Sequence, residues 1–102
     1  MGKEELIKGV YNFSHSLAKK YDLRKVYLFG SLAEGVFVKG SDVDIAVEGM
    51  DFEDYLKVLA EYRYIRGIHL DILHMDFCRQ QLKETILKEG KVLYEKKVKG
   101  KR

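Results

Sequence analysis

The 102-residue chain contains one cysteine, no proline and no tryptophan. A lone cysteine, Cys78, excludes an internal disulfide and a zinc site built from several cysteines. Cys78 lies in a segment with a helical pattern, where a small buried hydrophobe is the expected role. Because proline is absent, the stops between structural elements are left to the nine glycines.

Long apolar runs are lacking as well. The uncharged stretch 26–33 is far too short to cross a bilayer, which takes about 20 residues. The first residues, MGKEELIKG, have no apolar core of the kind that a secretion signal requires. We therefore expect a cytoplasmic protein without a membrane partner.

Negative charge is missing from one end of the chain only. Residues 96–102 carry five positive charges and no negative one, so residues 1–95 hold 14 basic against 16 acidic groups. The net charge of +3 therefore belongs to the tail, and the rest of the chain is mildly acidic. We expect one domain over 1–95 followed by a basic tail, 96–102, and the charge gives little support to a nucleic-acid partner.

Apolar spacing predicts four helical and four extended segments. The helices are expected at 3–21, at 31–35, at 52–66 with Asp51 as cap, and from Asp76 to about 88; the strands at 25–30, 42–48, 68–75 and 91–95. No repeat or linker divides the chain. The order predicts an α/β (α+β) fold in which a small mixed β-sheet has its helices on one face.

Three aspartates stand out on two of the expected strands. Strict alternation in 42–48 puts Asp42 and Asp44 on the same side of one strand, about 7 Å apart along its axis. Asp71 lies in the middle of the apolar strand 68–75, where a carboxylate is costly without a positive partner. Converging carboxylates repel one another, and hard oxygen ligands suit Mg²⁺. We expect Asp42, Asp44 and Asp71 to be metal ligands, with two Mg²⁺ ions.

A Gly-Ser pair follows the first strand. Gly30 allows the backbone to approach a phosphate closely, and the free amides of the helical turn that begins at Ser31 favour an anion. A nucleoside triphosphate would then lie between this turn and the metal-bound aspartates. The arrangement suits nucleotidyl transfer, in which Asp42 and Asp44 hold metal against the phosphates and Asp71 helps to deprotonate the attacking hydroxyl.

These motifs together resemble a known family. Gly30-Ser31, ten further residues, Asp42-x-Asp44 and a later strand with Asp71 look like the nucleotidyltransferase fold of the DNA polymerase β superfamily. The chain is most similar to the minimal nucleotidyltransferases, which are often antitoxins beside HEPN-domain toxins, and the likeness extends to its end, 86–95. The resemblance implies Mg²⁺-dependent transfer of AMP from ATP, in some members to a tyrosine of the cognate toxin, which silences a ribonuclease as in type VII toxin–antitoxin pairs.

One position departs from the family pattern. Many relatives have Ala-Arg-Gly after the Gly-Ser pair, whereas this chain has an anion there, Glu34. Ser31 and Glu34 fit a capping box, which would occupy the Ser31 hydroxyl. Other cations could replace the missing arginine, and the sequence leaves four open: Lys25, Lys39, Arg63 and Arg66.

The remaining polar and aromatic residues have plainer interpretations. His69 and His74 lie five apart on one strand and so point to opposite faces, which excludes one shared metal ion. A solvated or capping role is expected for both and for His15. The tyrosines fall mostly at core spacing, although Tyr64 and Tyr94 are alternatives for a partner surface.

Two functions of different class are left open by the sequence. The first is an enzyme that adenylylates a toxin partner, with small-molecule or nucleic-acid hydroxyls as weaker alternatives. The second is a non-catalytic antitoxin that neutralises a HEPN ribonuclease by binding it. Only the first requires Asp42, Asp44 and Asp71 together. A weaker third interpretation is a purely structural metal site.

Overall fold

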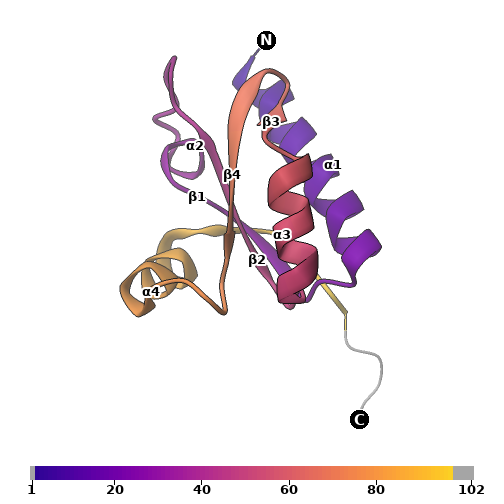
Figure 1. The fold of residues 1–102 in the computed structure, drawn as a ribbon. Coiled ribbons are helices and arrows are strands. Elements are labelled where there is room, and N and C mark those ends of the chain that lie inside the picture. The colour runs from indigo at the N-terminus through magenta and orange to yellow at the C-terminus, as the bar shows by residue number, and fades with distance from the viewer. Residues whose placement is uncertain (1, 98–102) are drawn as a thin grey trace.

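The computed structural model describes residues 2–97 (Figure 1). The elements in chain order are α1 (Lys3–Tyr21), β1 (Lys25–Phe29), α2 (Ser31–Glu34), β2 (Val43–Glu48), α3 (Phe52–Glu61), β3 (Tyr64–Ile65), β4 (Ile68–His74), α4 (Gln80–Glu89) and β5 (Lys91–Glu95). None of the helices within this range is long and apolar enough to cross a membrane.

The five strands form one mixed sheet in the order β3-β4-β2-β1-β5. β2 and β4 pair in parallel, since α3 crosses over between them, and β1 pairs antiparallel with both β2 and β5. The crossover places the central strands β2 and β4 side by side with their residues in register. The mixed sheet that the sequence predicts is confirmed.

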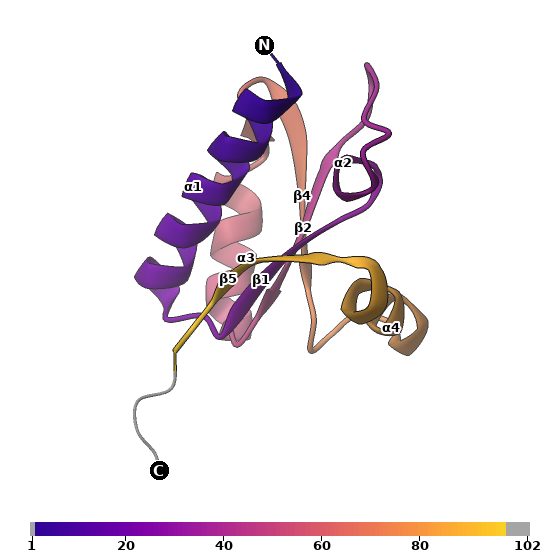
Figure 2. The ribbon, with the colours of Figure 1, turned by 180° about the vertical axis from the view of Figure 1, so that it is seen from behind.

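The alternating pattern of β2 separates the two faces of the sheet. Val43, Ile45 and Val47 are fully buried and belong to the main core, which α1 and α3 cover (Figures 1 and 2). Ala46 faces the other way, into a smaller cluster that includes Ile86 of α4. The expectation that the helices lie on one face therefore holds for α1 and α3 and is wrong for α4.

α4 lies on the second face because that face is apolar at one end. Tyr27, Ala46 and Met75 are buried there, and Ile86 and Leu82 of α4 pack against them. The other end of the same face carries Asp44 and Asp71 instead, and α4 does not extend over it (Figures 1 and 2). α4 thus covers half of this face and leaves the polar half to solvent.

The helix expected over 52–66 ends at Glu61, and a hairpin follows in its place. Ile65 of β3 pairs with Ile68 of β4 across a two-residue turn. The turn residues Arg66 and Gly67 have positive φ angles of 50° and 79°. This conformation matches the twist of a tight hairpin and cannot continue a helix.

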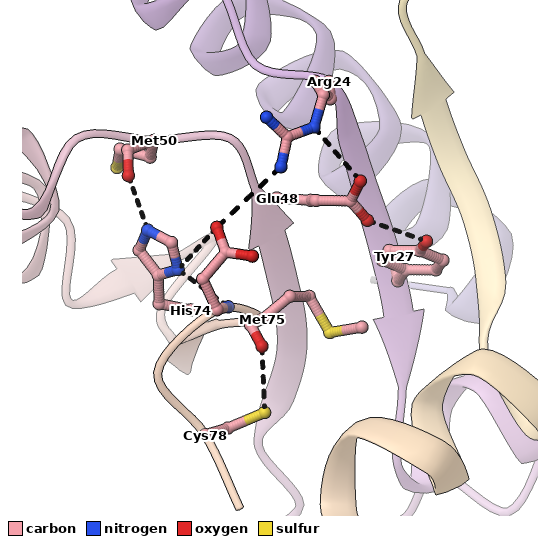
Figure 3. Close-up of polar contacts among 8 residues, drawn as sticks. Arg24, Tyr27, Glu48, Met50, His74, Met75 and Cys78 are labelled. Atoms are coloured by element: carbon pink, nitrogen blue, oxygen red, sulfur yellow. Dashed lines mark hydrogen bonds and ion pairs between the residues drawn. The ribbon is translucent and has the colours of Figure 1, made fainter. Parts of the chain in front are cut away.

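A polar network holds the strand ends that are remote from Gly30 (Figure 3). Arg24 Nε donates to Glu48 Oε2 at 3.3 Å, and the Tyr27 hydroxyl donates to Glu48 Oε1 at 3.2 Å. Arg24 also lies 4.0 Å from Asp76, in the turn after β4. The network connects β1, β2 and the end of β4 at the end of the sheet away from Asp44 and Asp71.

His74 belongs to the same region and corrects a prediction. Its side chain is 1% exposed, and its Nε2 lies 2.6 Å from the Met50 carbonyl oxygen. Its Nδ1 accepts a hydrogen bond from the Asp76 backbone N–H at 3.1 Å. The expected solvated or capping histidine is therefore a buried structural one. His15 is partly buried, with Nε2 3.0 Å from the Leu93 carbonyl oxygen.

The segment before α4 also differs from expectation. α4 begins at Gln80, and no side chain in the described part of the chain caps it, so Asp76 is not its cap. Asp76 lies in a turn together with Cys78, which is half-buried and not helical. The Cys78 thiol faces the Met75 carbonyl oxygen at 3.5 Å (Figure 3).

Candidate functional site

The uncovered half of the second sheet face carries the predicted aspartates. Asp44 of β2 is paired in register with Asp71 of β4, and Phe29 of β1 lies opposite Asp44 on its other side. Neighbouring strands are about 4.8 Å apart, so the two carboxylates are adjacent across the sheet. Asp44 is half-buried and Asp71 is exposed. We call this surface, formed by Asp42, Asp44, Tyr64, His69 and Asp71, the open face.

Asp44 is the most perturbed acid of the open face. Its pKa is raised from 3.8 to about 6, first by burial and then by the negative charges of Asp71 and Asp42, against a small lowering by His69. Any cation that reaches this carboxyl group would stabilise its ionised form. The charge repulsion that the sequence predicts among the three aspartates is present at Asp44.

Asp42 lies one row away, beside a histidine. It precedes β2 and its Oδ1 is 3.5 Å from Nδ1 of His69, which is on β4 two residues before Asp71. Tyr64 of β3 pairs with His69 in register, and their rings meet edge to face with centroids 5.8 Å apart. The open face therefore has two rows, one of Asp71 and Asp44 and one of Tyr64, His69 and Asp42.

The Gly-Ser turn approaches the same carboxylate from β1. Gly30 has φ 76° and ψ −158°, a conformation that is essentially restricted to glycine. A Cβ at this position would collide with Oδ2 of Asp44. Gly30 is thus required both by its backbone angles and by the space that Asp44 occupies.

The capping box predicted for Ser31 and Glu34 does not form. α2 begins at Ser31 with Gly30 as its N-cap, and within residues 2–97 no side chain caps it. The Glu34 backbone N–H donates to the Gly30 carbonyl oxygen at 3.1 Å, while the Glu34 side chain is exposed. The Ser31 hydroxyl is consequently not occupied by a cap.

The donor set fits Mg²⁺ by its chemistry. Mg²⁺ needs only one or two carboxylates when water and substrate phosphates complete its shell. Asp44 and Asp71 provide such a pair, with Asp42 in the neighbouring row. No three His, Cys, Asp or Glu side chains within residues 2–97 form a group that could hold an ion, so water and phosphate oxygens would complete the shell of a bound Mg²⁺.

Two of the four candidate cations are engaged away from the Gly-Ser turn. Lys25 is at the opposite end of β1 and lies 3.5 Å from Glu95. Arg66 lies against Gly9 of α1, on the helix-covered side. Lys39, in the exposed turn before β2, and the exposed Arg63 are left as alternatives.

Comparison with known proteins places the chain in a family. The model of the polymerase β nucleotidyltransferase domain matches residues 12–99. The chain belongs to the polymerase β nucleotidyltransferase family. It is also 33% identical over 104 residues to a protein of Methanocaldococcus jannaschii with the provisional name protein adenylyltransferase MJ0604, covering 92% of this chain and all of the relative. This nucleotidyltransferase family is the one that the sequence motifs resemble.

Solved structures share the fold of this nucleotidyltransferase. A toxin–antitoxin crystal structure with AMP-PNP matches with a TM-score of 0.61 at 22% identity, covering 84% of this chain and 73% of that one. A mutant of the toxin–antitoxin MntA-HpeT matches with a TM-score of 0.55 at 18% identity, covering 94% and 75%. At these identities the likeness concerns the fold.

Proposed function

We propose that this nucleotidyltransferase transfers AMP from ATP to the hydroxyl of a tyrosine in a cognate HEPN-domain toxin, and so acts as the antitoxin of the pair. The relative named as a protein adenylyltransferase and the toxin–antitoxin structures of the same fold support this proposal. The domain is assigned to 1–95, with 96–102 as a basic tail of which 98–102 lie outside the described residues. The reaction takes place in the cytoplasm.

The observation that carries the proposal is the in-register pair Asp44 and Asp71 beside the Gly30-Ser31 turn. We assign Asp42, Asp44 and Asp71 as metal ligands and catalytic residues, and Gly30 and Ser31 to the triphosphate. Bound Mg²⁺, with two ions in the complete site, would neutralise the phosphates and stabilise charge on the entering and leaving oxygens. The raised pKa of Asp44 supports a cation at this point.

The chemistry assigned to these residues is a single displacement. The tyrosine oxygen bonds to the α-phosphorus of ATP, and the bond from that phosphorus to the bridging oxygen breaks. Pyrophosphate leaves with the electron pair, and we assign the Ser31 hydroxyl and backbone amide to bind it. The phenolic proton passes to the carboxylate of Asp71, which is exposed and therefore accessible to an acceptor.

An exposed apolar surface supports a protein partner. Phe52, Leu56 and Leu59 of α3 are 49%, 50% and 36% exposed, and the nearby Phe77 is 62% exposed. Phe77 contacts Phe52 with ring centroids 5.2 Å apart, so the exposed rings adjoin. Contiguous exposed apolar side chains of this kind are typical of protein interfaces. The same surface favours the second candidate, neutralisation of the toxin by binding alone.

Protection of cells from the toxin distinguishes the two candidate functions, adenylylation and neutralisation by binding alone. We would co-express the toxin encoded beside this gene with wild type, with Asp44→Asn, and with Asp51→Asn as the matched control. Asp51 is an exposed aspartate whose side chain makes no cap hydrogen bond to α3. Catalysis predicts that Asp44→Asn loses protection while Asp51→Asn keeps it. Full protection by Asp44→Asn at equal expression would favour neutralisation by binding.

A further inference from the structure

Tyr64 and His69 lie in one row with Asp42 but have no part in the chemistry described above. Tyr64 is 66% exposed on the two-residue edge strand β3, and the His69 side chain is 52% exposed. This aromatic pair adjoins the carboxylates Asp42 and Asp71 and is accessible to a ligand. We propose that Tyr64 and His69 position the accepting tyrosine, an assignment that rests on the proposed function.

The direction of the displacement places the acceptor on this side. In an in-line transfer the attacking oxygen and the leaving oxygen lie on opposite sides of the phosphorus. Pyrophosphate is assigned to the Gly30-Ser31 turn, at the end of β1. The sheet order then runs from β1 through β2 and β4 to β3, so the side opposite the leaving group is the β4–β3 edge. Tyr64 and His69 are the side chains of the open face at that edge.

The chemistry of the pair matches an aromatic acceptor. Tyr64 and His69 meet edge to face at an interplanar angle of 80°, which leaves exposed ring surface on both. A third ring can join such a pair by stacking or edge contact. The incoming tyrosine would then lie on the row next to Asp71, whose carboxylate takes its proton.

The nucleobase is the competing occupant of the same pair. The ribose oxygen is bonded to the α-phosphorus roughly perpendicular to the line joining the entering and leaving oxygens, whereas the acceptor oxygen lies on that line, at the edge opposite pyrophosphate. The acceptor is therefore the occupant that this geometry favours. Contact with the base is an outcome that the experiment must be able to detect.

The first experiment measures binding without turnover. ¹⁵N-labelled protein with Mg²⁺ and an ATP analogue that has a methylene bridge between its α- and β-phosphates is titrated with N-acetyl-tyrosinamide. The expected result is a saturable shift of the amide resonances of Tyr64 and His69, which Tyr64→Ala and His69→Ala each abolish. Tyr64→Phe keeps the ring and should keep the shift. Saturable shifts confined to other residues, or none, would overturn the proposal.

The second experiment measures transfer to the same probe with ATP. Tyr64→Ala should lower kcat/KM for N-acetyl-tyrosinamide by about tenfold, the scale of one lost aromatic contact. The KM of this variant for ATP should stay within about twofold of the wild-type value, a difference too small to signify a lost contact. The matched control is Tyr11→Ala, because Tyr11 is also an exposed tyrosine against a histidine, His15, but lies on α1. That variant should leave both constants unchanged.

The outcomes separate this proposal from the proposed function. A raised KM for ATP with an unchanged acceptor constant in Tyr64→Ala would assign the pair to the nucleobase and overturn the acceptor role. Binding of N-acetyl-tyrosinamide at Tyr64 and His69, with no AMP transferred by wild type to the probe or to the toxin, would show that the pair binds a tyrosine side chain and would contradict the transferase.

Discussion

Replacing Asp44 with asparagine should stabilise the protein near neutral pH. The carboxyl pKa is about 6 in the folded chain against 3.8 for the free group, so ionised Asp44 opposes folding. A difference of about 2 pKa units corresponds to about 3 kcal/mol at most. Since Asp44 is only partly buried, solvent screening reduces this to roughly 1–2 kcal/mol. The residue assigned to catalysis is thus expected to lower stability.

The size of the effect depends on pH in a defined window. Well below pH 3.8, Asp44 is protonated in both the folded and the unfolded chain and contributes nothing. As pH rises from about 4 to about 6, the unfolded chain loses its proton first, and the destabilisation grows to its full value. The stability difference between Asp44→Asn and wild type should therefore be near zero at acid pH and should appear across this window.

Urea denaturation of both proteins from about pH 3 to about pH 8, without Mg²⁺, measures this difference. Each kcal/mol added to the free energy of unfolding should also raise the melting temperature by about 4–8 °C in a domain of this size. Asp51→Asn, at an exposed aspartate outside the open face, should show no such dependence. A variant Asp44→Asn that is less stable than wild type near neutral pH, or a difference that is constant with pH, would refute the reasoning.

Three other perturbations test the site and the fold. Gly30→Ala should lower the free energy of unfolding by about 1–3 kcal/mol in chemical denaturation, because the backbone angles are restricted to glycine. It should also weaken ATP binding, measured by calorimetry, because the added Cβ displaces Asp44. Mg²⁺ should raise the melting temperature of wild type more than that of Asp44→Asn, and ATP should add a further rise; a rise with Mg²⁺ and none with ATP would indicate a structural metal. His74→Ala should lose about 2–4 kcal/mol in chemical denaturation, because the Met50 carbonyl and the Asp76 amide lose their buried partner, without changing transfer per folded molecule.

The sheet and its faces could be predicted because alternation is a local property. The residues of β2 read Val-Asp-Ile-Ala-Val-Glu, and this pattern alone places Asp44 opposite the core side. The same argument separates Asp71 from Ile72 on β4. Which strands are neighbours is not local, so the in-register pairing of Asp44 with Asp71 required the structure.

The elements that were missed depend on turns and on tertiary contacts. The Arg66-Gly67 turn lacks the Asn-Gly or Asp-Gly signature of a tight hairpin, and the preceding residues fit a helix by apolar spacing. His74 resembles a surface histidine in sequence, and its burial depends on the Met50 carbonyl 24 residues away. α4 has an apolar stripe with Ile86, yet the stripe does not say which face of the sheet it covers.

The measurement that tests the central claim most directly is the intact mass of the partner protein. The purified chain, Mg²⁺ and ATP are incubated with the product of the neighbouring gene, which is the proposed toxin, and Asp44→Asn is tested in parallel. The account predicts a mass increase of one or more AMP units on the toxin, located to a tyrosine and absent with the variant. A tight complex with no change in mass, equal for wild type and Asp44→Asn, would contradict it.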